Sequence, residues 1–155
     1  MQQPWAAPWL KILQGEPTVG SLMALCEDNY RHLLRMAPDL SALSGTYRSQ
    51  SADHTDLYLE VLEQAPYTSL IHLTYYFQHA AGQRPDPDAT LRVYHDARQV
   101  EVLDLRQRAL PMDRLYDAPA LVNKWKANLF VSKWLAFCNY QGHYFSEDEA
   151  WSDAG

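Results

Sequence analysis

Apolar and polar residues alternate through the middle of this chain, over Leu57–Gln64, Thr68–Gln78 and Leu91–Leu105. A period of two places successive side chains on opposite faces of a strand, so each run predicts half-buried strand. The last run turns at Asp96–Gln99 and therefore predicts a hairpin. A shorter strand is expected at Thr46–Gln50. Since short connections join these runs, we predict an antiparallel meander of four to five strands with one buried face.

Helical periodicity lies on either side of the predicted sheet. Thr18–Ala37 repeats apolar residues at three- and four-residue steps, with Thr18 or Ser21 as the capping residue and Pro38 as the stop. Pro119–Tyr140 carries apolar residues on two sides, which indicates two packing contacts. The order helix, strands, helix predicts an α+β fold with the N- and C-terminal helices packed on one face of the sheet.

The length of 155 residues suits a single domain, which we expect over residues 18–144. Residues 1–17 contain three prolines and predict an N-terminal arm. Residues 145–155 are acidic and predict a C-terminal tail. Ser51–Asp56 is expected to form a polar turn, and His79–Ala89, with two prolines and a glycine, an exposed loop.

Charge and composition argue against several classes of protein. The net charge of -6 weakens any case for nucleic-acid binding, which depends on neutralising phosphates. No apolar run approaches the roughly 20 residues that span a bilayer. Cys26 and Cys138 lie inside helical patterns, and we expect buried, reduced thiols in a cytoplasmic protein. The six histidines are scattered and no phosphate-loop, dinucleotide or serine-hydrolase motif occurs, so no metal or cofactor is predicted.

The solvent face of the predicted meander is one candidate binding site. The alternation places an imidazole, a guanidinium, carboxylates and phenols on one side of the sheet. The residues that we expect to bind a ligand are Arg92, Tyr94, His72, Tyr76, Glu60 and Glu101. Such a face could hold a small anion or a planar ligand, with Arg92 on its acid group. It is equally typical of a solvated face with cross-strand pairs such as Glu60 with Arg92.

His95 and Asp96 form a second candidate. A carboxylate beside an imidazole raises its basicity and orients it, as in general base catalysis. Adjacent strand residues, however, point to opposite faces, so the two meet only if a turn begins at Asp96. The alternative is His95 at the edge of the core and Asp96 as a turn former.

The C-terminal helix offers a third surface. Its Phe130, Trp134 and Phe137 cluster on one side and could join two copies in a homodimer. The partner is therefore expected to be an unknown protein, a second copy or a small anionic ligand.

Three stretches together resemble the DUF1249 family of YqiB-like proteins: LCEDNYRHLLRMAP (Leu25–Pro38), LRVYHDARQVEV (Leu91–Val102) and NKWKANLFVSKWLAFC (Asn123–Cys138). The resemblance implies a short cytoplasmic bacterial protein and brings no activity, cofactor or catalytic residue. The absence of any catalytic motif favours a non-enzymatic binding or regulatory protein. The alternative is a small hydrolase of an anionic substrate, with His95 as the base and Arg92 as the anion clamp.

Overall fold

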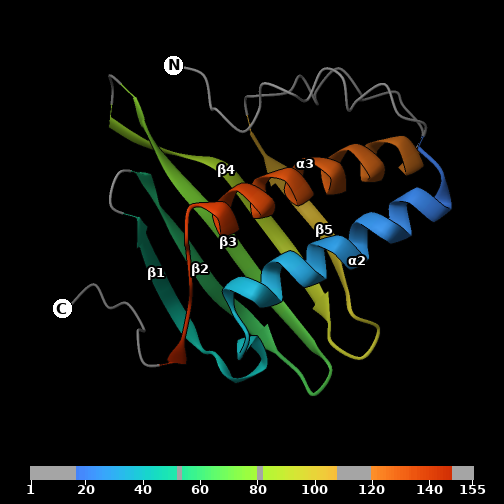
Figure 1. Cartoon of the computed structure of the whole chain (residues 1–155), viewed down its shortest axis with the longest axis horizontal. Coiled ribbons are helices and arrows are strands. Elements are labelled where there is room, and N and C mark those ends of the chain that lie inside the picture. The colour runs from blue at the N-terminus through green and yellow to red at the C-terminus, as the bar shows by residue number, and fades with distance from the viewer. Residues whose placement is uncertain (1–16, 52–53, 80–81, 108–119, 148–155) are drawn as a thin grey trace.

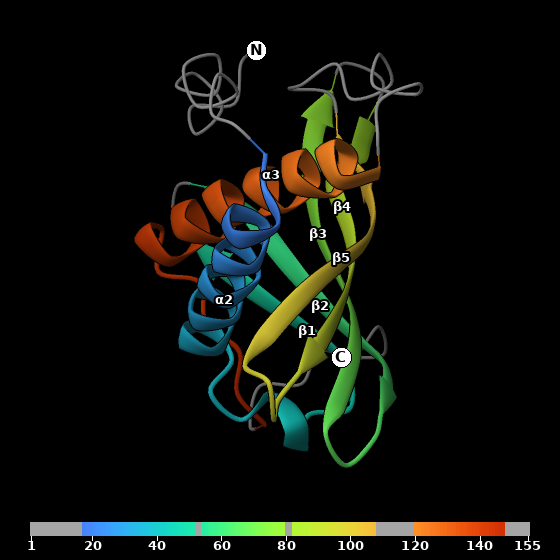
Figure 2. The same cartoon turned by 90° about the vertical axis from the view of Figure 1, so that its right-hand side faces the viewer.

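The computed structural model describes residues 17–51, 54–79, 82–107 and 120–147. Five antiparallel strands form one sheet in the order β1-β2-β3-β4-β5, and two helices pack together and on one face of it (Figures 1 and 2). The strands are β1 (Gly45–Ser51), β2 (His54–Gln64), β3 (Thr68–His79), β4 (Gly82–Tyr94) and β5 (Gln99–Arg106). The helices are α2 (Val19–Met36), the short 3-10 helix η2 (Leu40–Ala42) and α3 (Ala120–Tyr140). The predicted α+β meander is confirmed.

The first helix begins at a capping box. The Thr18 hydroxyl accepts a hydrogen bond from the Ser21 N–H at 3.0 Å, and the Ser21 hydroxyl accepts one from the Thr18 N–H at 2.9 Å. These bonds satisfy donors that a helix N-terminus otherwise leaves unpaired. At the other end, Pro38 follows Ala37 and prevents continuation. The expected helix, Thr18–Ala37, therefore matches α2 to within one residue at each end.

The core lies between the helices and one face of the sheet. Alternate residues of the strands are fully buried there, among them Leu59, Ile71, Leu73 and Leu91. Trp134 of α3 has no exposed surface, and its ring meets the ring of Tyr75 edge to face, with centroids 5.7 Å apart. Burying large apolar side chains of this kind is the main favourable contribution to folding.

The two helices also share a polar contact inside the core. Asn29 of α2 and Asn128 of α3 are both buried, and the Asn29 Nδ2 group donates to the Asn128 backbone oxygen (3.2 Å) and to its Oδ1 (3.3 Å). Asn29 lies on the apolar stripe that predicted α2. A buried amide is stable there only because the facing helix supplies acceptors.

The chain after α3 returns to the body. Gly142 adopts a positive φ of 84°, a conformation that glycine takes easily and that ends helices. The Phe145 N–H then donates to the Met36 oxygen at 2.8 Å, and the Phe145 ring is buried. Phe145, which the sequence assigns to the acidic tail, therefore packs in the core, while residues 148–155 and the predicted arm up to residue 16 lie outside the described residues.

Two sequence predictions about irregular segments are wrong. The expected loop His79–Ala89 is mostly strand, because β4 begins at Gly82 and contains both Pro85 and Pro87. Opposite Asp86 and Pro87, the register between β3 and β4 shifts, from Thr74 to Tyr76 of β3. The N–H group that Pro87 lacks therefore falls where the hydrogen-bond ladder is already interrupted. The Asp86–Pro87 peptide bond is cis. The expected turn Ser51–Asp56 is shorter, since β2 already includes Asp56.

Both cysteines are free thiols, as expected. Cys138 is fully buried, and burial raises its pKa to about 12. Its Sγ donates to the Tyr75 hydroxyl at 3.6 Å. Cys26 is partly buried in the α2–α3 contact.

Within the described ranges, neither α2 nor α3 combines the length and apolar character needed to cross a bilayer.

Candidate functional site

Two rows of side chains cross all five strands on the face turned away from the helices. Their position follows from the alternation in β2, β3 and β4, where their neighbours are buried core residues, and from the register that pairs β1 and β5 with these strands. Figure 2 shows both helices on the opposite side of the sheet. The first row is Thr46, Glu60, His72, Thr90 and Asp104. The second row is Arg48, Tyr58, Thr74, Asp88 and Arg106. We call this surface the polar face; it also carries Asp56, Tyr76, Arg92 and Tyr94, and it ends at Glu101 on the β5 edge, where the sheet borders the helices.

His72 lies at the centre of the polar face between two carboxylates. Its Nε2 contacts the Asp88 Oδ1, and its Nδ1 lies 3.9 Å from the Glu60 Oε1. The Thr74 hydroxyl donates to the same Asp88 oxygen at 3.0 Å. The imidazole and the Asp88 carboxylate are therefore already engaged with each other.

A cation and two rings form the β1–β2 side of the polar face. The Arg48 Nε and Nη2 both donate to the Asp56 Oδ2, at 2.9 and 2.6 Å. The Arg48 guanidinium carbon lies 5.9 Å from the centre of the Tyr58 ring. The Tyr58 and Tyr76 rings meet edge to face at 5.1 Å. Tyr76 is the more exposed ring, with 38% of its surface accessible.

A third cluster lies at the β4–β5 edge. Arg92 is opposite Glu101 in the register, and the Tyr94 hydroxyl donates to the Glu101 Oε1 at 3.1 Å. Partial burial and this bond raise the pKa of Tyr94. Lys124 of α3 reaches the Glu101 Oε2 at 3.8 Å. The Glu101 carboxylate is therefore held by a phenol and an ammonium group.

The six predicted ligand residues thus share one face but form three groups. Glu60 is opposite His72, Tyr76 joins Tyr58, and the other three lie at the β4–β5 edge. The suggested pair of Glu60 with Arg92 does not form, because the register places Leu70 and Glu101 opposite Arg92.

His95 lies in the β4–β5 turn, on the helix side of the sheet. Its Nε2 is 2.8 Å from the Ser69 hydroxyl, which is 2.5 Å from the Gln64 Oε1. The Gln64 Nε2 donates to the Leu40 and Leu43 oxygens (2.8 and 3.0 Å), which fixes Oε1 toward Ser69. An amide oxygen only accepts, so Ser69 donates to Gln64 and accepts from His95. His95 therefore carries its proton on Nε2.

His95 and Asp96 do not pair as a base and its orienting acid. The Asp96 Oδ1 instead accepts from the Ala97 N–H at 2.9 Å, the turn-forming contact considered above. The His95 ring meets the Tyr30 ring edge to face at 6.2 Å. Burial lowers the pKa of His95, and the nearby Asp96 charge only partly opposes this. Arg92, the suggested anion clamp, lies on the other face of the sheet from His95.

The three α3 residues predicted to form a homodimer offer little surface to a second copy. Phe130 and Trp134 have no exposed surface, and Phe137 is half-buried against the core. These rings hold the helix to its own chain. The homodimer stays a prediction, and in this conformation Phe130 and Trp134 have no surface to contribute to it.

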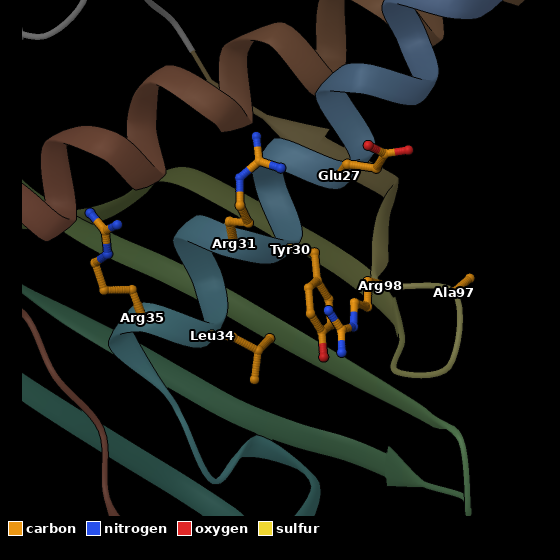
Figure 3. Close-up of a pocket in the computed structure, with 7 residues that line it drawn as sticks. All are labelled: Glu27, Tyr30, Arg31, Leu34, Arg35, Ala97 and Arg98. Carbon is orange, nitrogen blue, oxygen red and sulfur yellow. The ribbon is translucent and has the colours of Figure 1, made fainter.

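A groove that the sequence did not single out lies between α2 and the β4–β5 turn (Figure 3). It encloses about 680 Å³ and is lined by Glu27, Tyr30, Arg31, Leu34, Arg35, Ala97 and Arg98. The spacing of the α2 residues shows in the sequence that they share a helix face. Nothing in the sequence shows that Arg98 lies opposite them.

As for metals, no group of three or more His, Cys, Asp or Glu residues in the described ranges is arranged to hold an ion.

Comparisons with known proteins identify relatives without a known activity. Residues 32–144 match the family model described as "Protein of unknown function (DUF1249)". The chain is 30% identical over 131 residues to "Uncharacterized protein YqiB" of Escherichia coli strain K12, a match that covers 81% of this chain and 91% of that protein. The same protein of Escherichia coli O157:H7 matches to the same extent. No solved structure matches the chain.

Proposed function

We propose a function on physical grounds, because this chain belongs to the DUF1249 family, whose description states none. The protein is a non-enzymatic interaction protein that binds a protein partner through the polar face of its sheet. The observation that carries the proposal is a sheet face that neither helix nor any other described element covers. Its rings and arginines, Tyr58, Tyr76 and Arg48, are of the types enriched where protein partners bind tightly.

The charge of the polar face favours a basic partner over a small anion. Five carboxylates, those of Asp56, Glu60, Asp88, Glu101 and Asp104, outnumber the three arginines of this face, Arg48, Arg92 and Arg106. Arg48 is already bonded to Asp56. A basic protein surface would meet this excess of carboxylates with complementary charge, whereas a free anion would be repelled.

The enzymatic alternative has weaker support. It needs His95 and Arg92 to act on one substrate, and the sheet lies between them. Because the His95 Nε2–H group donates to buried Ser69, the base would have to be Nδ1, on the helix side of the sheet and away from Arg92.

Quantitative affinity capture with matched variants tests the proposal. We expect Tyr76→Ala to reduce recovery of a partner by about tenfold, because removing an exposed interface ring often costs more than 1 kcal/mol of binding. Recovery should also fall as salt is raised, since complementary charges are screened. Proteins captured by the wild-type chain and by the variant are compared by mass spectrometry.

Tyr140→Ala is the matched control. Tyr140 is 85% exposed near the end of α3, on the other side of the sheet, so its loss should leave capture unchanged. Equal recovery with Tyr76→Ala and the wild-type chain would reject the polar face as the binding surface. Loss of the partner with Tyr140→Ala alone would move the interaction to the helices.

A further inference from the structure

The groove between α2 and the β4–β5 turn is a second surface, separate from the polar face. Glu27, Tyr30, Arg31, Leu34 and Arg35 recur at three- and four-residue steps, so they line one side of α2. Arg98 lines the groove from the turn and lies beside Tyr30, while the guanidinium groups of Arg31 and Arg35 point away from it (Figure 3). The volume of about 680 Å³ lies within the range of sites that hold small molecules.

The walls of this groove are fixed by contacts already described. The turn is held by the bond from the His95 N–H to the Tyr67 oxygen (2.8 Å) and by the bond between His95 and Ser69. Tyr30 packs against the His95 ring, which joins α2 to the turn. A site whose walls are fixed before binding loses less entropy when a ligand enters.

The groove is positively charged in a protein whose net charge is -6. Arg31, Arg35 and Arg98 line it together with one acid, Glu27. Arg31 forms an ion pair with Asp28. Arg35 and Arg98 have no carboxylate within ion-pair distance in the described part of the chain. The groove therefore presents guanidinium groups with unused donors on two walls.

Arg98 adopts a positive φ of 56°, a conformation that glycine and asparagine take more easily than arginine. The turn geometry alone would be served better by glycine. The guanidinium of Arg98 reaches over the groove toward Tyr30 (Figure 3). An arginine at this backbone position gives the turn a cation that a glycine would not.

We propose that this groove binds a small anion of the phosphate class. Arg98 binds it from the turn, and the exposed side chains of Arg35 and Arg31 turn toward it from α2. Guanidinium groups suit this chemistry, because their planar donors form paired hydrogen bonds to phosphate oxygens. The half-exposed Tyr30 and Leu34 side chains offer contact to an apolar part of the same molecule. The small anionic ligand expected at Arg92 is thus assigned to the opposite side of the sheet.

Titration calorimetry with pyrophosphate, at a constant ionic strength of about 0.15 M, tests this assignment. Arg98→Gly and Arg35→Gln should each weaken binding by about tenfold or more, since each removes charge-assisted hydrogen bonds. Arg98→Gly retains the fold, because glycine adopts a φ of 56° without strain. The control is Arg106→Gln, which removes an equally exposed arginine on β5 outside the groove and should change the affinity less than twofold.

Three results would overturn the proposal. Pyrophosphate could bind Arg98→Gly as tightly as the wild-type chain, which would exclude the groove. Arg106→Gln could weaken pyrophosphate binding as much as Arg98→Gly does, which would show that binding depends only on the overall charge of the protein. Citrate or hexaglutamate could bind more tightly than pyrophosphate with the same dependence on Arg98, which would make the ligand a carboxylate or an acidic peptide.

Discussion

At the scale of single residues, the hydroxyl of Ser69 joins three segments of the chain. It donates to Gln64 of β2, whose amide group in turn donates to the backbone oxygens of Leu40, the first residue of η2, and of Leu43, the residue after η2. It accepts from His95 of the β4–β5 turn. Ser69 has no exposed surface, so water cannot replace it. The helical connection, the β2–β3 hairpin and the turn are therefore tied together at one buried atom.

Ser69→Ala should lower the free energy of unfolding by about 1–3 kcal/mol, because it leaves the Gln64 Oε1 and the His95 Nε2–H group without their partner in a buried site. Urea denaturation measures this loss. Ser132→Ala is the control: it removes a buried serine hydroxyl from α3, where alanine favours the helix, and should change stability by less than about 0.5 kcal/mol. Equal effects of the two substitutions would contradict the linking role of Ser69.

The chemistry of His95 could be read from the sequence only in part. The period of two placed it on the core side and made Asp96 a turn residue, and both positions match the structure. Its partner Ser69 lies 26 positions away, and no local pattern connects the two. The same holds for Asn29 with Asn128, whose contact depends on how two helices meet.

At the scale of elements, alternation identified β2 and β3 because each has one buried and one exposed face. It also identified β5, although Val100 is the one fully buried residue of that strand. Alternation did not identify the start of β4, because Pro85 and Pro87 in this segment predict a loop. A bulge that accommodates prolines depends on the facing strand, which a local pattern does not contain. The groove escaped prediction for a similar reason: its arginines come from a helix and a turn more than 60 positions apart.

α3 shows why two apolar sides need not mean a second subunit. One side packs on the sheet, the other on α2, and Phe130 is fully buried within the chain. Phe130→Ala should therefore lower the free energy of unfolding by about 3–5 kcal/mol, through lost burial and a residual cavity. The loss should be the same at low and high protein concentration, because no partner is involved.

Urea denaturation at two protein concentrations, combined with sedimentation, makes this measurement. Tyr140→Ala is the control on the same helix, since its exposed ring should contribute less than about 0.5 kcal/mol. A destabilisation by Phe130→Ala that shrinks as protein concentration rises, with a dimer dissociating in the centrifuge, would instead support the homodimer.

At the scale of the whole molecule, the two faces of the sheet differ in burial and in charge. The helix side holds the core and, at its margin, a cationic groove; the other side is acid-rich and is covered by none of the described elements. A basic partner is therefore proposed for one side of the sheet and a small anion for the other, in keeping with the charge of each side. Both helix-side histidines near the groove, His32 and His95, have lowered pKa values.

These two shifts predict acid sensitivity. The pKa of His32 is lowered by burial and by the neighbouring Arg35, Arg31 and Lys133, and that of His95 by burial. Above the ordinary value of 6.5, both histidines are neutral in the folded and unfolded chain. As the pH falls below it, the unfolded chain takes up protons that the folded chain resists, so stability is lost.

Replacing either histidine by glutamine should therefore reduce the stability lost between about pH 7.5 and pH 5.5, a window around the unperturbed histidine pKa and above the range where carboxylates protonate. His95→Gln keeps an N–H donor for Ser69 and removes only the titration. The measurement is the urea midpoint of each variant and of the wild-type chain at both pH values. The double variant should lose the least, because the two side chains titrate separately. An equal or larger acid loss in the variants would show that neither histidine resists protonation in the folded protein.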